Sequence, residues 1–432
     1  MADRINVLLM GGGGREHAIA DRLTRSPRLG QLWITHGQNP GLAALGRVAD
    51  VPVAIRESYR LVQFCDHHDI GLVVIGPEEP LAEGFADKLR TPTRKVFGPG
   101  ADGARIEADK AWAKQLMRGA SIPTAEARVF TDADGARTYL RSREHPPVIK
   151  ASGLAKGKGV FVPDSLAEAL DAIDRIMVQR VFGDAGREVV IEERLTGSEV
   201  SVLALVDGRS IYVLETAQDH KRLGDRDSGP NTGGMGAFTP STIVDEATMA
   251  KIQSLVLVPA LDALRRDGID FRGVLYAGIM LTHAGPKVLE FNCRFGDPEC
   301  QAILVRLKSD LLELMLATCD GKLADTDVEW EPGASCCVVL AAEGYPEKPK
   351  SGAVIHGLDA AAAVEGVTIY HAGTTRARDG TIVTAGGRVL GVTAVGADLE
   401  QARRRAYAAC DLIVFAGKTY RTDIGIKAAP TG

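Results

Sequence analysis

Apolar runs alternate with helix-forming segments over the first hundred residues. Residues 5–10, 32–35 and 72–76 are mainly apolar runs of the length of buried strands, and residues 15–25 are predicted to form a helix after the first of them. This order of strands and helices predicts a parallel sheet with helices on both faces. Gly98-Pro99-Gly100 marks the end of the unit.

A second unit is predicted to begin near residue 109, and a third near residue 330. In the second unit we expect helices over residues 111–118, 165–178 and 304–317, and strands over residues 148–150, 189–192, 274–281 and 287–292. In the third we expect strands over residues 336–341, 367–371 and 388–395, and a helix over residues 399–409. Residues 217–238 are rich in Gly and Asp and are expected to be a long functional loop. The predicted domains are therefore residues 1–108, 109–329 and 330–432.

Composition agrees with a multidomain globular protein. The chain has 432 residues, enough for about three domains, and its net charge of −5 does not indicate a general nucleic-acid surface. The apolar run near the N-terminus is too short for a signal-peptide core or a membrane span. The seven cysteines are odd in number and form no CxxC pair, which indicates reduced thiols. We expect a cytoplasmic protein with no membrane and no nucleic-acid partner.

Residues 289–301, LEFNCRFGDPECQ, carry the densest chemistry in the chain. In a strand, Glu290 and Asn292 share one face, and a carboxylate beside an amide oxygen suits a hard cation such as Mg²⁺. Arg294 follows with a planar fork suited to phosphate or carboxylate. The alternative is a solvent-facing strand edge followed by a salt-bridged loop.

Four glycines, residues 11–14, follow the first strand and open a helix. Backbone N–H groups at such a turn can bind an anion. A dinucleotide site would also need an acid after the next strand, but His36-Gly37 stand there. A phosphate or sugar-phosphate is therefore favoured over NAD, and a tight packing turn is the alternative.

A glycine- and lysine-rich run follows the strand that ends at Lys150. Its sequence, KASGLAKGKG over residues 150–159, places lysine charges in a loop able to cover a phosphate, although the P-loop spacing is absent. The alternative is a solvated basic turn.

At residues 192–199 the chain passes from a strand to a loop whose backbone could pair with an adenine edge, and Glu199 could accept from ribose hydroxyls. A salt-bridged strand end is the alternative there, and for His220 we expect a structural role rather than that of a base.

Taken in order, these motifs resemble the phosphoribosylamine–glycine ligases, also called glycinamide ribonucleotide synthetases, of the ATP-grasp superfamily. The resemblance covers nearly the whole chain and rests on residues 11–17, 76–81, 218–222, 230–236, 294–301 and 420–425. Ser152 and Glu79 depart from the family pattern. The resemblance implies an α/β and α+β multidomain fold: an N-terminal Rossmann-like parallel sheet, a two-lobed ATP-grasp unit with a mobile lid over about residues 122–195, and a small mixed C-terminal domain.

The resemblance also implies an ADP-forming ligation of glycine to 5-phosphoribosylamine through glycyl phosphate, with ATP as co-substrate and Mg²⁺ or Mn²⁺ as the metal. A monomer is expected, and a transient contact with the upstream enzyme that makes phosphoribosylamine is left open. One alternative is an ATP-grasp ligase for another carboxylate and amine. A non-catalytic nucleotide-binding protein and an NAD dehydrogenase are weaker alternatives, because the metal ligands and the lysine loop are present and the ribose-binding acid is not.

Each site residue is assigned by the same resemblance. The residues expected to bind ATP are Lys110, Lys150, Lys156, Gly157, Lys158, Gly159, Glu192, Glu193, Leu195 and Glu199. Those expected to bind the other substrates are Gly14, Arg15, Glu78, Asp219 and Arg294, with Asp219 at the glycine ammonium. Arg294, Asp297 and Lys150 are expected to be catalytic. Glu290 and Asn292 are the expected metal ligands, and residues 274–281 offer no third acid.

Overall fold

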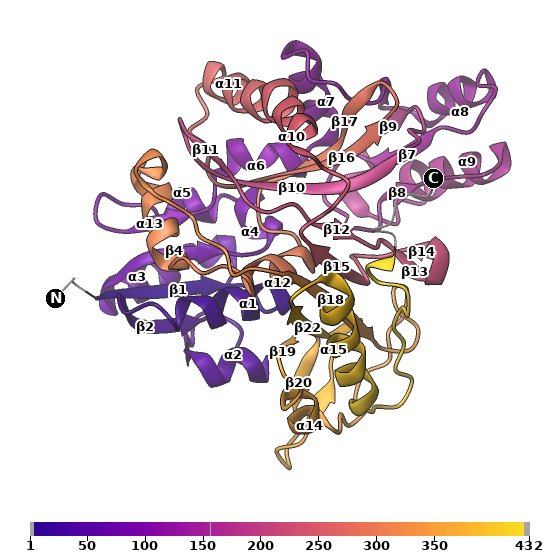
Figure 1. Cartoon of the computed structure of the whole chain (residues 1–432). Coiled ribbons are helices and arrows are strands. Elements are labelled where there is room, and N and C mark those ends of the chain that lie inside the picture. The colour runs from indigo at the N-terminus through magenta and orange to yellow at the C-terminus, as the bar shows by residue number, and fades with distance from the viewer. Residues whose placement is uncertain (1–3, 156, 427–432) are drawn as a thin grey trace.

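The first hundred residues form a five-stranded parallel sheet with strand order β3-β2-β1-β4-β5 (Figure 1). The computed structural model describes residues 4–155 and 157–426. Alternate side chains of β1 pack into two separate apolar clusters, Val7 with Ile19 of α1 and Leu8 with Leu61 of α3, so helices cover both faces as predicted. The elements are β1 (Ile5–Met10), α1 (Gly14–Leu23), β2 (Leu29–Ile34), α2 (Pro40–Leu45), β3 (Arg47–Val48), α3 (Ser58–His67), β4 (Ile70–Ile75), α4 (Glu78–Ala82), α5 (Phe85–Leu89), β5 (Lys95–Phe97) and α6 (Ala101–Ala108).

After α7 (Lys110–Gly119) the chain builds a small lobe with its own antiparallel sheet, in the order β6-β9-β7-β8. Ile149 and Ile191 from this sheet pack against Leu140 and Ile173 from two helices, which gives the lobe a separate apolar core. The elements are β6 (Ala127–Phe130), α8 (Ala133–Arg141), β7 (Val148–Ala151), β8 (Val160–Phe161), α9 (Leu166–Ile173), a π-helical turn (Asp174–Val178), and β9 (Val189–Glu192). Figure 1 shows this lobe projecting from the rest of the molecule.

The central sheet is antiparallel and has the order β11-β10-β16-β17. It carries β17, the strand that contains the predicted metal ligands, beside the long strand β16. The elements of this part are β10 (Ser198–Asp207), β11 (Ile211–Val213), α10 (Glu246–Ile252), α11 (Val258–Arg266), β16 (Arg272–Thr282), β17 (Gly285–Asn292), α12 (Glu299–Leu304) and α13 (Leu311–Asp320).

Residues 246–266 form one continuous helix made of α10, a π-helical turn (Gln253–Leu257) and α11. By length and composition alone, this helix could cross a membrane. Its inner side chains, including Ile252, Val256 and Leu264, lie in the same apolar core as β10 and β16. Packing against that core accounts for much of the apolar character of the helix. The expectation of no membrane partner stays a prediction.

The last sheet has the order β12-β15-β18-β22-β19 and therefore includes two strands from before the predicted boundary at residue 330. Gly236–Thr239 of β15 pairs antiparallel with β18, so the two ends of the segment 217–238 belong to this sheet, while β13 and β14 between them form a separate two-stranded sheet. The elements are β12 (Gln218–Asp219), β13 (Arg222–Gly224), β14 (Ser228–Asn231), β15 (Gly236–Thr239), β18 (Ala334–Ala341), α14 (Leu358–Ala362), β19 (Val367–His371), β20 (Thr374–Arg376), β21 (Ile382–Thr384), β22 (Arg388–Gly396) and α15 (Leu399–Leu412).

Two predictions of local structure were wrong. The single helix expected over residues 304–317 is two helices, α12 and α13, because the Asp310 carboxylate accepts from the N–H groups of Leu312 and Glu313 and starts a new helix. The segment 217–238 is not an unstructured loop but contains four short strands, β12 to β15. The predicted fold class is confirmed.

Candidate active site

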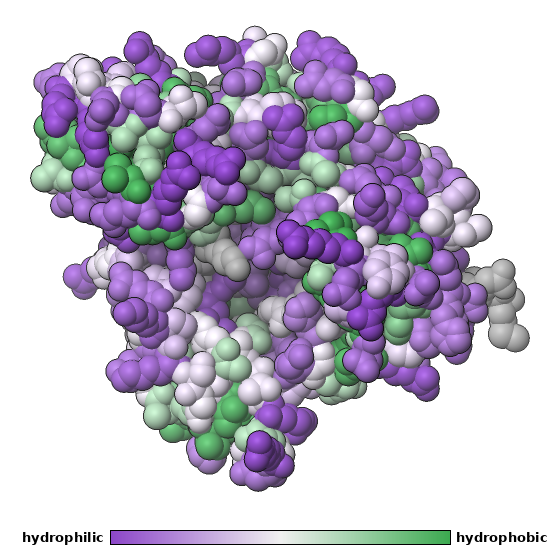
Figure 2. Space-filling view, turned by 180° about the vertical axis from the view of Figure 1, so that it is seen from behind, coloured by the Kyte–Doolittle hydropathy of each residue, from purple (hydrophilic) through white to green (hydrophobic). Residues whose placement is uncertain are grey.

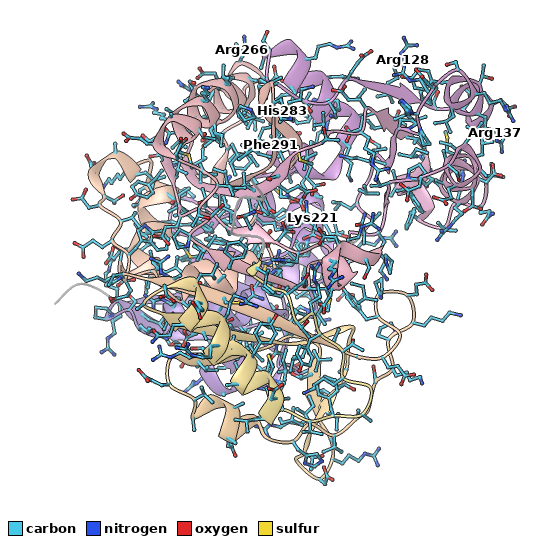
Figure 3. The ribbon with its side chains drawn as sticks, turned by 45° about the vertical axis from the view of Figure 1, so that its right-hand side comes forward. Arg128, Arg137, Lys221, Arg266, His283 and Phe291 are labelled. Atoms are coloured by element: carbon cyan, nitrogen blue, oxygen red, sulfur yellow. The ribbon has the colours of Figure 1, made fainter. Side chains whose placement is uncertain are left out.

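The predicted site residues converge on one cleft of about 1370 Å³ that is lined from all parts of the chain. Figure 2 shows one face of the molecule hollowed between its upper and lower parts, and Figure 3 places Lys221 near the middle of the protein while Arg137 and Arg266 lie at its edge. Among the described residues predicted for the site, all line the cleft except Gly14 and Lys158. Lys156 lies outside the described residues.

The floor of the cleft is the end of β17, where Glu290 pairs with Gly278 and Asn292 with Tyr276 of β16. The two-residue spacing puts both side chains on one face. Gly278 has no side chain, so the space beside the Glu290 side chain stays open. Burial by itself would raise the pKa of Glu290, but Lys221, Lys150 and Lys110 outweigh it and hold the pKa below its ordinary value. Glu290 is therefore ionised at neutral pH.

Three lysines lie around Glu192, the last residue of β9. Lys150 forms an ion pair with one Glu192 oxygen and donates to the Leu289 carbonyl at 3.0 Å. Lys114 contacts the other Glu192 oxygen at 2.6 Å. Burial lowers the pKa of Lys114 and that of Lys110, which donates to the Gly153 carbonyl at 3.3 Å. This cluster concentrates positive charge on β7 and α7 beside the Glu290 carboxylate.

On the opposite wall, Lys221 forms a 2.9 Å ion pair with Glu199 of β10. Lys221 lowers the pKa of Glu199, while burial raises the pKa of Asp219 to about 7 despite the nearby Lys221. Beneath them the buried Glu299 carboxylate accepts from Tyr276 Oη at 2.6 Å and from Ser201 Oγ at 3.2 Å. His220, between Asp219 and Lys221 in the chain, has a buried ring 6.1 Å from that of Phe238.

Arg294 is held between two carboxylates at the end of the floor. Its Nη2 lies 2.7 Å from Glu107 Oε1 and its Nε lies 3.1 Å from Glu78 Oε2. Burial would lower the pKa of Arg294, but Glu107 and Glu78 raise it well above its ordinary value. Glu107 also accepts from the Cys293 N–H at 2.8 Å, so it fixes both the guanidinium and the backbone beside it. The Arg294 side chain keeps 16% of its surface exposed and lines the cleft.

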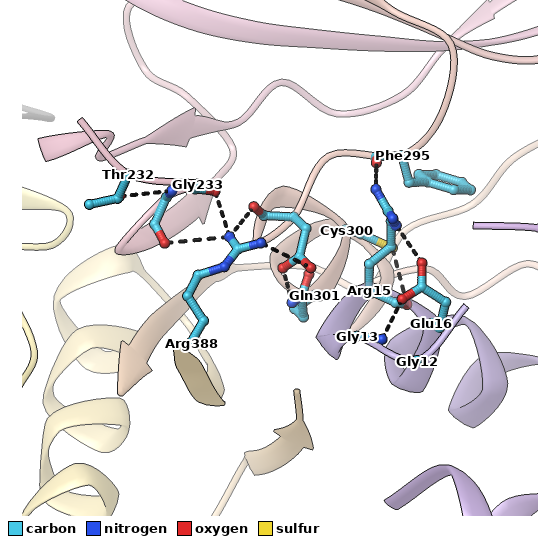
Figure 4. A network of polar contacts seen from close by, with 12 residues as sticks. Gly12, Gly13, Arg15, Glu16, Thr232, Gly233, Phe295, Cys300, Gln301 and Arg388 are labelled. Carbon is cyan, nitrogen blue, oxygen red and sulfur yellow. Dashed lines mark hydrogen bonds and ion pairs between the residues drawn. The ribbon is translucent and has the colours of Figure 1, made fainter. Parts of the chain in front are cut away.

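Arg388 of β22 joins the loop that contains Asp297 to the glycine-rich residues 229–236 (Figure 4). Its guanidinium lies 3.3 Å from the Asp297 carboxylate and also donates to the backbone carbonyls of Asp297 and Gly233. Gln301 donates to the other Asp297 oxygen at 2.8 Å. Burial would raise the pKa of Asp297, but Arg388 leads the positive groups that lower it. The C-terminal sheet thus supplies one wall of the cleft.

The glycine turn at residues 11–14 packs closely against its surroundings. The Gly13 N–H donates to Glu16 Oε2 at 2.7 Å, so an internal carboxylate already faces the start of α1. A Cβ on Gly14 would lie 2.7 Å from Gln301 Nε2. Arg15 does reach the cleft, where it donates to the Phe295 carbonyl at 3.0 Å (Figure 4). It also lies 4.0 Å from Glu78. Arg15 and Glu78 meet at the carboxyl edge of the parallel sheet and line the cleft, whereas Gly14 does not line it.

The donor set fits a divalent hard cation that keeps ligands from outside the protein. Glu290 offers an ionised carboxylate, and among the described residues Asn292 Oδ1 has a single side-chain contact, at 3.5 Å from Arg294. Among the described residues no cluster of three His, Cys, Asp or Glu side chains has the geometry of a metal site. Two protein oxygens with the remaining positions left to phosphate and water is the pattern of Mg²⁺ sites in phosphoryl-transfer enzymes.

Among the cleft residues that the sequence interpretation missed, Glu107, Lys114, Lys221 and Arg388 form ion pairs with residues predicted for the site. A signal existed for Lys114, which lies one helical turn after Lys110 on α7. Another existed for Lys221, which is inside the motif at residues 218–222. Glu107 and Arg388 lie in ordinary helix and strand patterns, and nothing local distinguishes them.

Comparison with known proteins gives matches along the whole chain. Models described as the N domain, the ATP-grasp (A) domain and the C domain of phosphoribosylglycinamide synthetase match residues 5–107, 108–300 and 335–427. The phosphoribosylamine–glycine ligase of Rhodopirellula baltica is 48% identical over 435 residues, covering 99% of each chain. The crystal structure of that ligase from Thermotoga maritima aligns with a TM-score of 0.83 at 35% identity, over 97% of this chain and all of the other. The biotin carboxylase domain of Hydrogenobacter thermophilus 2-oxoglutarate carboxylase, with MgADP, ADP and bicarbonate, has a TM-score of 0.74 at 16% identity over 97% of this chain and 92% of that one, a likeness of fold alone.

Proposed function

The chain belongs to the phosphoribosylglycinamide synthetase family, and from this premise we propose that it joins glycine to 5-phosphoribosylamine at the expense of ATP. The products are glycinamide ribonucleotide, ADP and phosphate, in a step of purine biosynthesis. The observation that carries the proposal is the 48% identity to a phosphoribosylamine–glycine ligase across 99% of both chains. An ADP-forming carbon–nitrogen ligase of the ATP-grasp type follows from the family itself.

The first chemical problem is repulsion, because a carboxylate must approach the γ-phosphate of ATP. Two unit charges 4 Å apart repel by about 4 kcal/mol at an effective dielectric of about 20. Lys110 and Lys150 lie close enough to Glu290 to lower its pKa, so their charges are concentrated at the floor of the cleft. We assign these two lysines to the ATP phosphates, where they offset the repulsion as the glycine carboxylate attacks and ADP leaves.

Glu290 and Asn292 are the proposed metal ligands, with Mg²⁺ or Mn²⁺ as the ion. When bound, the cation neutralises charge on the phosphates and orients the transferring group. Glu290 stays ionised at neutral pH because the surrounding lysines lower its pKa, and Asn292 adds a neutral oxygen on the same face of β17. The protein therefore supplies two oxygen ligands, one from Glu290 and one from Asn292, with lysines nearby.

The nucleoside is assigned to the wall formed where β9 leads into β10. Glu192, Glu193 and Leu195 line the cleft at this junction, and Glu199 follows on β10. Glu199 pairs with Lys221, which keeps the carboxylate ionised and able to accept from ribose hydroxyls. The loop between β7 and β8, with Gly157, Lys158 and Gly159, is assigned to cover the phosphates, and the same role was predicted for Lys156.

The amide-forming step needs the acyl phosphate and the amine held together. Arg294 is assigned to the substrate carboxylate or acyl phosphate, since it lines the cleft between Glu78 and Glu107. Asp297 is assigned to orienting substrate beside it, and Asp219 to the glycine ammonium. Gly14, Arg15 and Glu78 are assigned to phosphoribosylamine at the edge of the N-terminal sheet, with Arg15 and Glu78 in the cleft and Gly14 outside its lining. The amine nitrogen then attacks the carbonyl carbon, the bond to phosphate breaks, and phosphate leaves.

The test is ADP release with ATP, Mg²⁺, glycine and freshly made phosphoribosylamine, omitting one component at a time. Release that requires both substrates, with one amide formed per ADP, is the expected result. Equal ADP release with another amino acid, or without the amine, would assign the cleft to another carboxylate and amine pair, which is the second candidate.

Analytical sedimentation of the same protein tests the expected monomer. Mixing it with the phosphoribosylamine-producing enzyme tests a direct transfer of the labile amine. The division at residues 108 and 329 and a cytoplasmic location are part of the proposal.

A further inference from the structure

The motif at residues 420–425, Tyr-Arg-Thr-Asp-Ile-Gly, has no place in the chemistry proposed above, although Arg421 is one of the largest fully buried side chains in the protein. Burying a guanidinium costs several kcal/mol unless carboxylates and carbonyls satisfy it. Arg421 is 0% exposed, and its partners come from two segments almost 200 residues apart in the chain. Such a side chain fixes one segment against the other.

Arg421 donates from Nε and Nη2 to the two carboxylate oxygens of Asp423, at 2.7 Å each, and from Nη1 to Asp227 Oδ1 at 2.9 Å. It also donates to the Arg222 carbonyl at 3.2 Å. Asp227 and Arg222 belong to the hairpin formed by β13, a short 3-10 turn and β14, residues 222–231. The guanidinium therefore bridges the closing motif and this hairpin.

Two more contacts hold the tip of the same hairpin. The Thr422 N–H donates to the Asp225 carboxylate at 2.8 Å, and the Thr422 hydroxyl donates to its other oxygen. In return the Arg226 N–H donates to Asp423 Oδ2 at 2.8 Å. Arg226 and Asp227 adopt left-handed backbone conformations, with φ of 55° and 54°, which cost free energy unless neighbouring contacts impose them.

Apolar packing does little to hold the hairpin in place. Residues 225–230 are exposed, and Leu223 and Pro230 are the only apolar side chains among residues 222–231. Apolar burial therefore contributes little to its position. Yet Arg222, Asp227 and Asn231 line the cleft, as do Thr232 and Gly233, which follow directly. The hairpin begins next to Lys221, the partner of Glu199.

We propose that Arg421, Thr422 and Asp423 are positioning residues that lock the hairpin 222–231 as a wall of the active-site cleft. None of the three lines the cleft, so they act through Asp225, Asp227 and the hairpin backbone. The effect of these residues on catalysis rests on the proposed function. Their attachment of the hairpin rests only on the contacts described above. A carboxyl-terminal motif thereby sets the shape of a site whose chemistry lies on the central sheet.

The experiment compares Arg421→Lys and Asp225→Ala with the wild-type chain. Lysine keeps the charge but cannot make the bidentate contact. Asp225→Ala removes the carboxylate that accepts from Thr422, and it does so without changing a residue of the C-terminal domain. Arg404→Gln is the control, because Arg404 is exposed on α15 and does not line the cleft. Limited trypsin digestion reports the hairpin directly, since Arg222 and Arg226 are cleavage sites within it.

We expect both variants to be cut at Arg222 or Arg226 about tenfold faster under native conditions, because cleavage follows the population of the open hairpin. We also expect KM for ATP or phosphoribosylamine to rise about five- to tenfold, with a smaller change in kcat, from a misplaced wall. Thermal unfolding of Asp225→Ala should stay near that of the control. If Arg421→Lys fails to fold, Asp225→Ala carries the test alone.

Wild-type rates of hairpin cleavage in Asp225→Ala would overturn the lock. Faster cleavage with unchanged KM and kcat would overturn the positioning role. If the wild-type chain itself forms no amide product, the proposed function fails, and the digestion still decides whether the closing motif locks the hairpin.

Discussion

Arg294 and Arg421 are both held between two carboxylates, but they differ in what remains of their surface. Arg294 lies between Glu78 and Glu107, keeps 16% of its side chain exposed and lines the cleft. Arg421 lies between Asp227 and Asp423 and keeps none. A guanidinium with no exposed surface can only hold structure together, while one with an open side can still bind a ligand. Residual exposure thus separates the arginine proposed to bind substrate from the architectural one.

The surroundings of the two arginines differ in the same way. Arg294 follows the strand that carries Glu290 and Asn292, and its charge contributes to lowering the pKa of Glu290. Arg421 belongs to the C-terminal part and reaches the site only through the hairpin at residues 222–231. Changes near Arg294 should therefore act on turnover, and changes near Arg421 on substrate affinity and local order.

The strongest test of the site around Arg294 is Glu290→Ala, which removes the proposed charged metal ligand. We expect turnover to fall by about a thousandfold or more, since a bound metal supplies several kcal/mol of transition-state stabilisation. Folding stability should change only modestly, because the lost carboxylate lies at a cleft. ADP release and thermal unfolding measure the two effects, and Glu313→Ala, at a surface ion pair with Arg28, is the control. A normal rate with Mg²⁺ present would remove the metal assignment.

The comparison itself is tested by the same substitution at both arginines. Arg294→Lys is expected to lower kcat/KM by about 10²–10³-fold, because lysine cannot reproduce the fork at the reacting groups. Arg421→Lys is expected to lower it by about tenfold, mainly through KM. Steady-state kinetics with both substrates distinguish them. Equal losses, or a larger loss at Arg421, would break the distinction between binding and architecture.

Acid stability offers a third comparison, through the carboxylates that hold the two arginines. Burial would raise the pKa of Glu78, but Arg294 and Arg15 lower it from 4.5 to about 2. Because the folded-state pKa is depressed, this stabilisation is complete above pH 4.5 and is lost as the pH falls toward 2.

Glu78→Gln should therefore cost up to about 3 kcal/mol of unfolding free energy at neutral pH and approach the wild type near pH 2. Urea unfolding across this pH range measures it. Asp423→Asn should behave in the same direction, because Arg421 leads in lowering the pKa of Asp423 against its burial. A constant difference between Glu78→Gln and wild type at every pH would contradict the ion-pair explanation.

The smallest effect is expected at a lysine outside both arginine clusters. Lys158 lies in the loop between β7 and β8 and is exposed. Lys158→Ala should raise KM for ATP by about fivefold with little change in kcat, the scale of one partly screened charge. Lys322→Ala, an exposed lysine that does not line the cleft, is the control. An unchanged KM for ATP would exclude a role for Lys158 in covering the phosphates.

Local patterns were sufficient for most of the fold. Apolar runs and their spacing located β1, β7, β9, β17 and the final helix, because a strand or helix face is specified by neighbours in sequence. They failed at residues 304–317, where the Asp310 cap outweighs continued helical periodicity. They failed again at residues 217–238, where the strand β15 is stabilised by pairing with β18 about a hundred residues later.

The candidate site divides along the same line. The sequence alone was enough to predict which residue types would carry the proposed chemistry, since Glu290, Asn292 and Arg294 stand together in one motif and Lys150 ends a strand. Only the tertiary structure decided the partners that give these groups their charge state and direction. Glu78 meets Arg294 across 216 residues, and Arg421 meets Asp227 across 194. Such pairings are set by how sheets and loops pack, and neither periodicity nor spacing along the chain contains that information.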